Sequence, residues 1–531
     1  MKKLVCLMPS ICLAVFALVG CSTQSFKGVS DYAGEVSSNG GFAVVKGDYV
    51  YFVNGSQEST ADNTFGSVVK GALVRAKLAD VNQYGKETPA EVVIPKLIYT
   101  EYKANNSGFY IFGDYVYYPT PSTEKNMQGT VKNTIVEFTK TKLDGTDSTI
   151  LAKVDGLSTP FRFVQKGGKV FLTVYQAVDG KNYFITYDEA GSEVKRSQAI
   201  ASYIFSSDDT ASYAFYEKLA FNEALDRDES FNEVYRYNLD GSGEEKVLSG
   251  AGLYTAEDGI GTQGVKYAFV ALNSKLLILS QTLVDTTVSN ATRYYGIELD
   301  KVTANTSDTY KNLTLLNEGA HNAASIFTAN SVYHSLDTIV YNDSVYGLVR
   351  YNYNDRENVK TYGLEILIND KDMMGYTYCY DDGEYLYYFG NENYYRIKLA
   401  DALAKNNTLA QFTFTETSGV NDFYRMEVIG NTLLILNAHD PFNSYVCAYP
   451  MNALEGKNKD QIKEYVEEFA KADREHLVAA TNYRVGVFTE EDKKALTEYI
   501  DNKYPQEDSS SEASSSEASS SEASSSEASS N

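Results

Sequence analysis

The chain has 531 residues, of which 47 are Lys or Arg and 71 are Asp or Glu, so its formal net charge is −24. Its length exceeds that of a typical single domain, and a hydrophobic content of 43% is enough for a large core, which excludes a wholly disordered chain. The acidic balance argues against DNA or RNA as a partner, because phosphate groups would be repelled. The 44 tyrosines and 25 phenylalanines, with no tryptophan, favour a strand-rich chain.

The first 20 residues have the order of a secretory signal peptide. Met1–Lys3 is cationic, Leu4–Val19 is almost entirely apolar, and the segment then closes on small residues. The apolar stretch is shorter than the roughly 20 residues that a membrane-spanning helix needs. We therefore expect residues 1–20 to be removed from the mature protein.

The last residues of this segment, Leu18-Val19-Gly20-Cys21, resemble the lipobox of bacterial lipoproteins. The resemblance implies cleavage before Cys21, a diacylglyceryl group on its sulfur, and additional acyl chains such as palmitate. It also implies a lipid-anchored protein on the extracytoplasmic face of the cell membrane, with membrane lipid as a partner. A plain secreted protein whose signal ends in Gly-Cys is the alternative. Residues 21–40, rich in Ser and Gly, are expected to be a flexible spacer.

Two cysteines remain for the folded region after Cys6 and Cys12 leave with the signal and Cys21 is lipidated. Cys379 and Cys447 could form one disulfide outside the cytoplasm or remain two buried thiols, and their spacing favours the second reading. Two cysteines and four scattered histidines match no zinc-binding pattern. We expect no metal site.

One pattern recurs eight times within residues 41–455: a turn pair, an aromatic-rich strand, and an answering strand. The first copy is Gly47–Phe52 with Leu73–Leu78, and the clearest is Gly383–Tyr388 with Tyr394–Leu399. The other copies begin near Gly113, Gly167, Ser212, Asn273, Asn342 and Gly430. Additional strands are expected in segments such as 97–99 and 161–164.

This repetition predicts an all-β fold, a β-propeller of about eight, alternatively seven, four-stranded blades across residues 41–455. Stacked sandwiches would not repeat one hairpin so often, and the coils of a β-helix are shorter. The hairpins resemble the Tyr-rich propeller repeats of bacterial surface proteins that are related to the low-density-lipoprotein-receptor type. This resemblance implies a fold and no activity.

The two C-terminal segments have a different composition. In residues 456–504, Ile462, Val466 and Phe469 share one helical face, and a second helix is expected to begin at Thr489. This small helical extension either packs on the propeller or docks a partner. Residues 505–531, built mainly from Ser, Glu and Ala, are expected to form a disordered tail.

No segment nominates a catalytic residue or a cofactor site. Gly259–Gly264 matches G-x-G-x-x-G, but Val265–Leu279 has the composition of a strand, whereas a dinucleotide site requires a helix there. The histidines lack the spacing of a catalytic set; they are His321, His334, His439 and His476.

An acidic loop faintly suggests calcium; its carboxylates are Glu223, Asp226, Asp228 and Glu229. Phe231 and Tyr237 occupy the positions where an EF-type loop needs Gly and Glu, so a solvated loop is the better interpretation.

The sequence therefore predicts a lipid-anchored, monomeric binding module that recognises a protein or a polysaccharide through the loop-bearing face of its propeller. An envelope scaffold protein is the first alternative. An extracellular polysaccharide hydrolase or lyase is the second, since the abundant carboxylates allow it but single out no pair. A non-enzymatic role is favoured.

Overall fold

The computed structural model describes residues 28–318 with short gaps and, beyond residue 318, mainly strands. The described ranges are 28–55, 63–81, 90–99, 108–132, 134–156, 159–206, 212–222, 226–249, 265–272, 276–283, 292–318, 332–334, 338–343, 347–352, 364–368, 377–381, 385–390, 393–398, 410–411, 425–429, 432–437, 445–450 and 484–491, with positions 400, 494 and 498.

The described strands form seven antiparallel sheets, which follow one another in chain order. The first contains β1 (Val36–Ser37), β2 (Ala43–Lys46), β3 (Tyr49–Val53), β4 (Leu73–Lys77) and β5 (Ala90–Ile94). The second contains β6 (Tyr110–Phe112), β7 (Tyr115–Pro121), β8 (Ile135–Lys142) and β9 (Thr149–Asp155). The third is an eight-stranded sheet, with β10 (Phe161–Lys166), β11 (Lys169–Val178), β12 (Lys181–Tyr187), β13 (Glu193–Arg196), β14 (Ile200–Phe205), β15 (Tyr213–Asn222), β16 (Arg227–Asn238) and β17 (Glu244–Ser249).

Four four-stranded sheets follow. The fourth contains β18 (Val265–Leu272), β19 (Leu276–Leu283), β20 (Thr292–Glu298) and β21 (Thr314–Glu318), and the fifth contains β22 (Val332–His334), β23 (Thr338–Asp343), β24 (Gly347–Asn352) and β25 (Leu364–Ile368). The sixth contains β26 (Thr377–Asp381), β27 (Tyr385–Gly390), β28 (Asn393–Lys398) and β29 (Ala410–Gln411). The last contains β30 (Arg425–Ile429), β31 (Thr432–Asn437), β32 (Tyr445–Pro450) and β33 (Arg484–Val485).

Helical structure is minor in the described part of the chain. Helix α1 (Leu78–Val81) follows β4, while the 3-10 turn η2 (Leu299–Lys301) and helix α2 (Thr306–Asn312) lie between β20 and β21. None of the described helices has the length and apolar composition needed to cross a bilayer. The prediction of a mostly β chain built from antiparallel hairpins is confirmed.

The eight-stranded sheet consists of two four-stranded sets joined at a narrow seam. The first set is β10–β13 and the second is β14–β17, and the pairing between them is the single residue pair Asn182 and Ile200. Among the described strands, β2 to β33 therefore form eight consecutive sets of four, and β1 is an additional strand at the edge of the first set.

The repeated sequence pattern forms the two central strands of each set. In the first copy, β3 pairs with β4 so that Tyr51 lies opposite Arg75, and the turn before β3 places Gly47 at a φ of +58°, which glycine adopts without strain. The sixth copy differs, because Asn342 and Asp343 end strand β23 and do not precede it.

Residues 97–99, expected to be a strand, have no strand structure. Strand β5 ends just before Pro95, which has no N–H to donate to a sheet. The N–H of Ile98 donates to the Gly71 carbonyl in a loop, and that of Tyr99 donates to the Pro119 carbonyl in β7, so these groups are satisfied without a paired strand. The expected strand at 161–164 is confirmed as part of β10.

Successive sets are held together by apolar clusters. One cluster joins the first two sheets through Val53 and Phe109, and the next joins the second sheet to β10–β12 through Phe138 and Phe161. Phe184 and Tyr216 belong to a cluster between the two halves of the eight-stranded sheet. The following cluster contains side chains of β15–β17 and β18–β20. The core is therefore distributed between neighbouring sheets.

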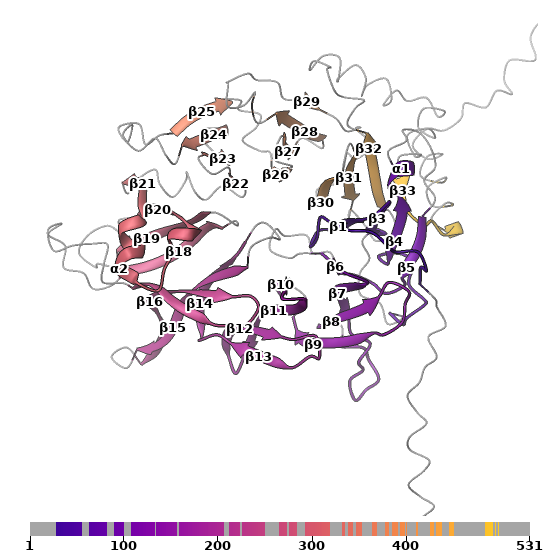
Figure 1. The fold of residues 1–531 in the computed structure, drawn as a ribbon, viewed down its shortest axis with the longest axis horizontal. Coiled ribbons are helices and arrows are strands. Elements are labelled where there is room, and N and C mark those ends of the chain that lie inside the picture. The colour runs from indigo at the N-terminus through magenta and orange to yellow at the C-terminus, as the bar shows by residue number, and fades with distance from the viewer. Residues whose placement is uncertain are drawn as a thin grey trace, which may run out of the picture.

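The last sheet packs against the first. Their shared apolar cluster includes Phe42 and Phe52 from the first sheet and Leu434 and Val446 from the last. Figure 1 shows the last sheet, coloured brown, beside the indigo strands of the first. Contacts between the first and last sheets therefore bring together residues that are far apart in the sequence. Ala43 and Glu427, which form a hydrogen bond, are 384 positions apart.

Candidate functional site: the hairpin face

The two ends of the strands carry different connections. In an antiparallel sheet the connections alternate between the two ends. At one end lie the tight turns that follow β2, β6, β8 and β16, and we call this end the turn face. At the other end lie the connections that follow β3, β7, β11 and β15, and we call this end the hairpin face. The two faces present different side chains.

Asx turns shape part of the turn face. Asp144 accepts the N–H of Thr146 at 2.9 Å, and Asp240 accepts the N–H of Ser242 at the same distance. Burial alone would raise the pKa of Asp144, but hydrogen bonds from Thr146 and the nearby Lys142 outweigh it, so this pKa lies below its usual range. The Asp144 carboxylate is therefore charged at neutral pH.

The N-terminal end of the described chain is fixed to this face. The N–H of Gly28 donates to the Asp144 carbonyl at 2.8 Å, and that of Val29 donates to the Leu143 carbonyl at 3.2 Å. Further along, the Gly47 N–H donates to the Glu35 carbonyl. Residues 28–40, the larger part of the expected flexible spacer, thus lie against the first two sheets.

Neighbouring connections meet on the hairpin face. The side-chain amide of Asn63, which follows β3, donates to Thr120 Oγ1 at the end of β7 at 2.9 Å. Lys181, beside the turn between β11 and β12, forms an ion pair of 3.0 Å with Asp228, beside the turn between β15 and β16. These contacts place connections from neighbouring sets side by side.

A rigid turn presents Met127 at the tip of the connection between β7 and β8. The Asn126 side-chain oxygen accepts the N–H groups of Gln128 and Thr130 at 3.0 and 2.9 Å, and the Asn126 N–H donates to the Thr130 carbonyl at 2.7 Å. The Met127 side chain is fully exposed. Lys125 is also exposed and pairs with Val131 across the hairpin. We call residues 125–131 the Met127 finger.

A second exposed apolar side chain stands at the far end of β15. Phe221 is 52% exposed, and the tip beyond it includes Asp226 at a φ of +49°. Large exposed hydrophobic side chains in the described chain are few: besides Met127 and Phe221 they are Ile150 and Val194, which lie on the outer strands β9 and β13. The hairpin face therefore holds two exposed apolar tips.

A buried charged network supports the base of the Met127 finger. Glu137, 8% exposed, accepts the hydroxyl of Ser122 at 2.8 Å and forms an ion pair with Lys153 at 3.0 Å. Nearby, Lys96 donates to the Asn63 carbonyl at 2.9 Å. Burial lowers the pKa of Lys96, and the charge of Glu137 offsets part of this effect. The network therefore supports the connection between β7 and β8 from beneath the Met127 finger.

Two tyrosines take part in packing where the described inner strands of the eight-stranded sheet meet. Tyr175 and Tyr203 are stacked, with ring centroids 4.0 Å apart, and both pack on the cluster around Phe184. Burial raises the pKa of Tyr203 to about 12. Arg162 lies over the Phe205 ring at 5.1 Å and donates to the Ser206 carbonyl at 2.7 Å. This cluster joins two sets of strands.

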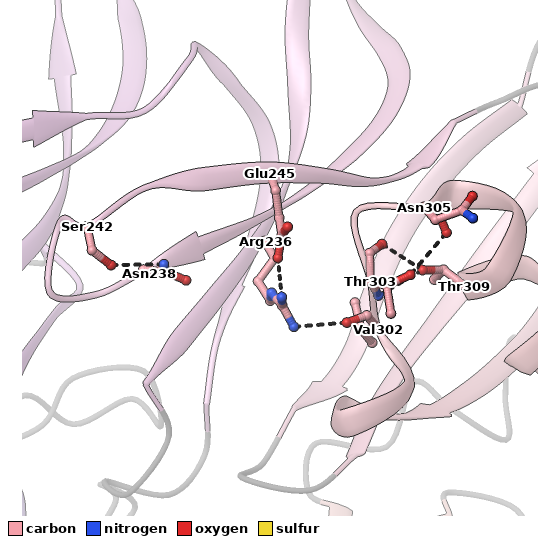
Figure 2. A network of polar contacts seen from close by, with 8 residues as sticks. All are labelled: Arg236, Asn238, Ser242, Glu245, Val302, Thr303, Asn305 and Thr309. Atoms are coloured by element: carbon pink, nitrogen blue, oxygen red, sulfur yellow. Dashed lines mark hydrogen bonds and ion pairs between the residues drawn. The ribbon is translucent and has the colours of Figure 1, made fainter.

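A further polar network joins the fourth and fifth sets of strands near the turn face, beside the turn that follows β16 (Figure 2). Arg236 forms an ion pair with Glu245 and donates to the Val302 carbonyl at 3.0 Å. Thr309 accepts the Thr303 N–H at 3.0 Å, which holds helix α2 to the segment after η2. The contacts of Arg236 therefore connect β16 and β17 to the segment that follows η2, and so join the fourth and fifth sets.

Most of the expected chemical features lie outside the described residues. They are Cys21, the segment 259–264, Glu223, and His321, His439 and His476. A strand, β18, does follow the glycine-rich segment, as expected. Cys379 lies in β26 and Cys447 in β32, which belong to separate sheets. Residues 456–475 are also outside the described residues, whereas β33 and the helical positions 490, 491, 494 and 498 fall within the expected helical extension.

The structure describes the side chains of two of the four carboxylates of the acidic loop, Asp226 and Asp228. Asp228 is engaged by Lys181 and Asp226 is exposed, and no group of three or more ligating side chains occurs among the described residues. The sequence analysis missed the Met127 finger. Its signal is Asn126 and Gly129 flanking an apolar residue between two predicted strands, a turn pattern that differs from the repeated Gly-Asp pair.

No model of a known protein family matches the chain, and no curated protein matches it. Among solved structures, a computationally designed protein is 9% identical with a TM-score of 0.35, covering 75% of this chain and 99% of its own. A prolyl endopeptidase is 9% identical with a TM-score of 0.40, covering 71% of this chain and 50% of its own. A eukaryotic initiation factor is 12% identical with a TM-score of 0.34, covering 73% and 92%. We infer no activity from these similarities.

Proposed function

We propose that this protein is a lipid-anchored extracytoplasmic binding module whose sheets form a closed eight-bladed β-propeller. The eight consecutive four-stranded sets support this architecture, as do the apolar clusters that join neighbouring sets and the cluster between the first and last sheets. Such a ring presents loops from every blade around one face, which suits recognition of a macromolecule.

The contrast between the two faces carries the functional proposal. The turn face has short Gly/Asp turns and holds the start of the described chain at Gly28. The hairpin face carries the long connections that follow β3 and β7, and it has two exposed apolar tips, Met127 and Phe221. Exposed apolar side chains on a rigid support are typical of surfaces that bind a partner. We assign the binding role for a protein or a polysaccharide to the hairpin face.

Membrane attachment through diacylglyceryl-Cys21 is the second part of the proposal. It is supported by the sequence Leu18–Cys21 and by its place seven residues before the point where the chain meets the sheets. Mass spectrometry of the N-terminal peptide of the protein from its native membrane tests it. We expect Cys21 as the first residue with the mass of a diacylglyceryl group; an unmodified thiol would refute it.

The binding role is tested with the full chain carrying Cys21→Ser, which cannot be acylated. It is presented to a glycan array and to solubilised envelope proteins, alongside the same chain with Met127→Gln and Phe221→Gln. We expect binding that the double substitution abolishes. Binding that survives it but is lost with Asp147→Lys on the turn face would assign the wrong face. Turnover of a polysaccharide would favour the hydrolase or lyase alternative.

A further inference from the structure

We propose that the turn face rests toward the lipid surface and that the hairpin face points away from it, with the turn around Asp144 as the pivot. This inference rests on the proposed anchor at Cys21 and adds the orientation of the protein on the membrane. The partner of the turn face is thus a phospholipid bilayer. Three features support it. They are the contacts of Gly28 and Val29 with the turn around Asp144, the seven residue steps between Cys21 and Gly28, and the length of strand β8.

The fixed point is Gly28–Val29. Besides its two backbone hydrogen bonds to Leu143 and Asp144, this segment inserts the Val29 side chain, 5% exposed, into the cluster between the first two sheets. A Cβ atom at Gly28 would lie 2.4 Å from the Leu143 carbonyl oxygen, so the two backbones are in direct contact. The chain therefore enters the folded body at the turn between β8 and β9.

The connection is short. Seven residue steps separate Cys21 from Gly28, and a fully extended chain covers at most about 25 Å over that distance. An acyl group on Cys21 must lie in the bilayer. Residues at the Asp144 turn are consequently held within about 25 Å of the lipid surface.

Strand β8 sets the height of the opposite face. It begins at Ile135, next to the connection that carries Met127, and ends at Lys142, next to the Asp144 turn. The seven residue steps of about 3.3 Å along its eight residues separate its two ends by roughly 23 Å. For the Met127 finger to reach the lipid, the chain between Cys21 and Gly28 would have to extend along the full length of β8. No length of chain would then remain to place the acyl group of Cys21 in the bilayer.

The charge of the turn face limits how closely it approaches the bilayer. Aspartates occupy several of its described turns, at positions 48, 114, 144, 147 and 240, and Lys142 and Lys166 pair with two of them. Carboxylates tolerate zwitterionic headgroups and are repelled by anionic ones within a Debye length. The turn face is therefore close to a neutral bilayer and farther from an anionic one, while the order of the two faces stays the same.

Energy transfer measures this order directly. The full lipidated chain is reconstituted in phosphatidylcholine vesicles that contain a headgroup-labelled acceptor lipid. An azide-bearing amino acid replaces either Asp147 on the turn face or Met127 on the hairpin face, and it carries the donor dye. We expect the donor at position 127 to be roughly 23 Å or more farther from the headgroups than the donor at 147. Equal distances, or the reverse order, would overturn the proposal.

Two controls separate this outcome from failure of the anchor. If mass spectrometry finds Cys21 unmodified, the proposed anchor is wrong, and a lipid coupled to an azide at Ser22 then tests the orientation alone, because it enters through the same fixed point. Attaching that lipid at position 127 instead must move the donor at position 147 farther from the headgroups than it is in the Ser22-anchored chain. If the Ser22-anchored chain shows no difference between the two faces, the orientation is refuted independently of the natural modification.

Discussion

The carboxylate of Glu427 in the last sheet accepts the backbone N–H of Ala43 in the first sheet at 3.1 Å. The same carboxylate occupies the space that a side chain at Gly41 would need, since a Cβ there would lie only 1.2 Å from Glu427 Oε1. A glycine near the start of the chain and a glutamate near its end are therefore mutually required. Glu427 is 7% exposed, so its hydrogen bond is made in a largely dry environment.

The first prediction concerns this pair. Gly41→Ala forces Glu427 or the backbone to move, and we expect it to lower the free energy of unfolding by about 1–3 kcal/mol, as overpacking typically does. Urea denaturation monitored by tyrosine fluorescence measures the change. Gly243→Ala is the matched control, because no atom lies within 4 Å of its added Cβ. In a Glu427→Ala background, the cost of Gly41→Ala should become smaller; an unchanged cost would contradict the steric explanation.

The second prediction separates binding from stability on the hairpin face. Met127→Gln removes a fully exposed apolar side chain that contributes nothing to the core, so the free energy of unfolding should change by no more than about 0.5 kcal/mol. Affinity for the partner should fall at least tenfold if Met127 is an anchor of the interface, about 1.4 kcal/mol. Ile150→Gln on the outer strand β9 is the control and should leave affinity unchanged. Loss of affinity with both substitutions would move the site away from the finger.

The third prediction is a pH dependence. Burial raises the pKa of Tyr203 from 10.0 to about 12, so the folded state keeps a proton that the unfolded state loses in this interval. The contribution of Tyr203 is complete below pH 10 and declines as the pH rises toward 12, by up to about 1.4 kcal/mol per pH unit. Tyr203→Phe should flatten this decline in denaturant titrations at alkaline pH. A curve parallel to that of the native protein would show that Tyr203 titrates normally.

The fourth prediction concerns the entry point of the chain. Val29→Ala leaves a gap among buried side chains, and we expect a loss of about 1–3 kcal/mol together with faster exchange of the Gly28 and Val29 amide hydrogens. Hydrogen-exchange mass spectrometry of the N-terminal peptide measures this. Ser38→Ala is the comparison, since residue 38 is exposed and lies outside the cluster. Similar exchange in both variants would mean that Val29 does not fix the entry point.

The sequence was sufficient to predict the repeated hairpins, because their apolar alternation and turn residues are local properties. The second copy illustrates this, since Tyr115–Tyr118 lies in β7 and pairs with its expected answering strand, β8. Two errors came from features that local pattern does not encode. Residues 97–99 have the composition of a strand, yet their N–H groups donate to the single carbonyls of Gly71 and Pro119 and form no ladder. Asn342 and Asp343 resemble a turn although they end a strand.

The functional surface was less predictable than the fold. The exposure of Met127 depends on the direction in which its connection leaves the sheet. The hydrogen bonds of Asn126 set that direction, and the presence of an asparagine in the sequence does not by itself predict that they form. The attachment of Gly28 and Val29 could not be predicted either. Their partners are backbone atoms of Leu143 and Asp144, more than 100 positions away, and every residue type has a backbone carbonyl that can accept such a hydrogen bond.

The contact between the first and last sheets constrains the order of events during biosynthesis. Phe42 and Phe52 are completed as a cluster only by Leu434, Val446 and their neighbours, which leave the ribosome long after the first sheet. A partly synthesised or truncated chain would therefore expose the apolar side chains of the first sheet, because the last sheet that buries them is missing. Quality-control proteases and chaperones recognise such exposed apolar side chains, so loss of even a short stretch around Val485 should remove the protein from the cell before it can accumulate.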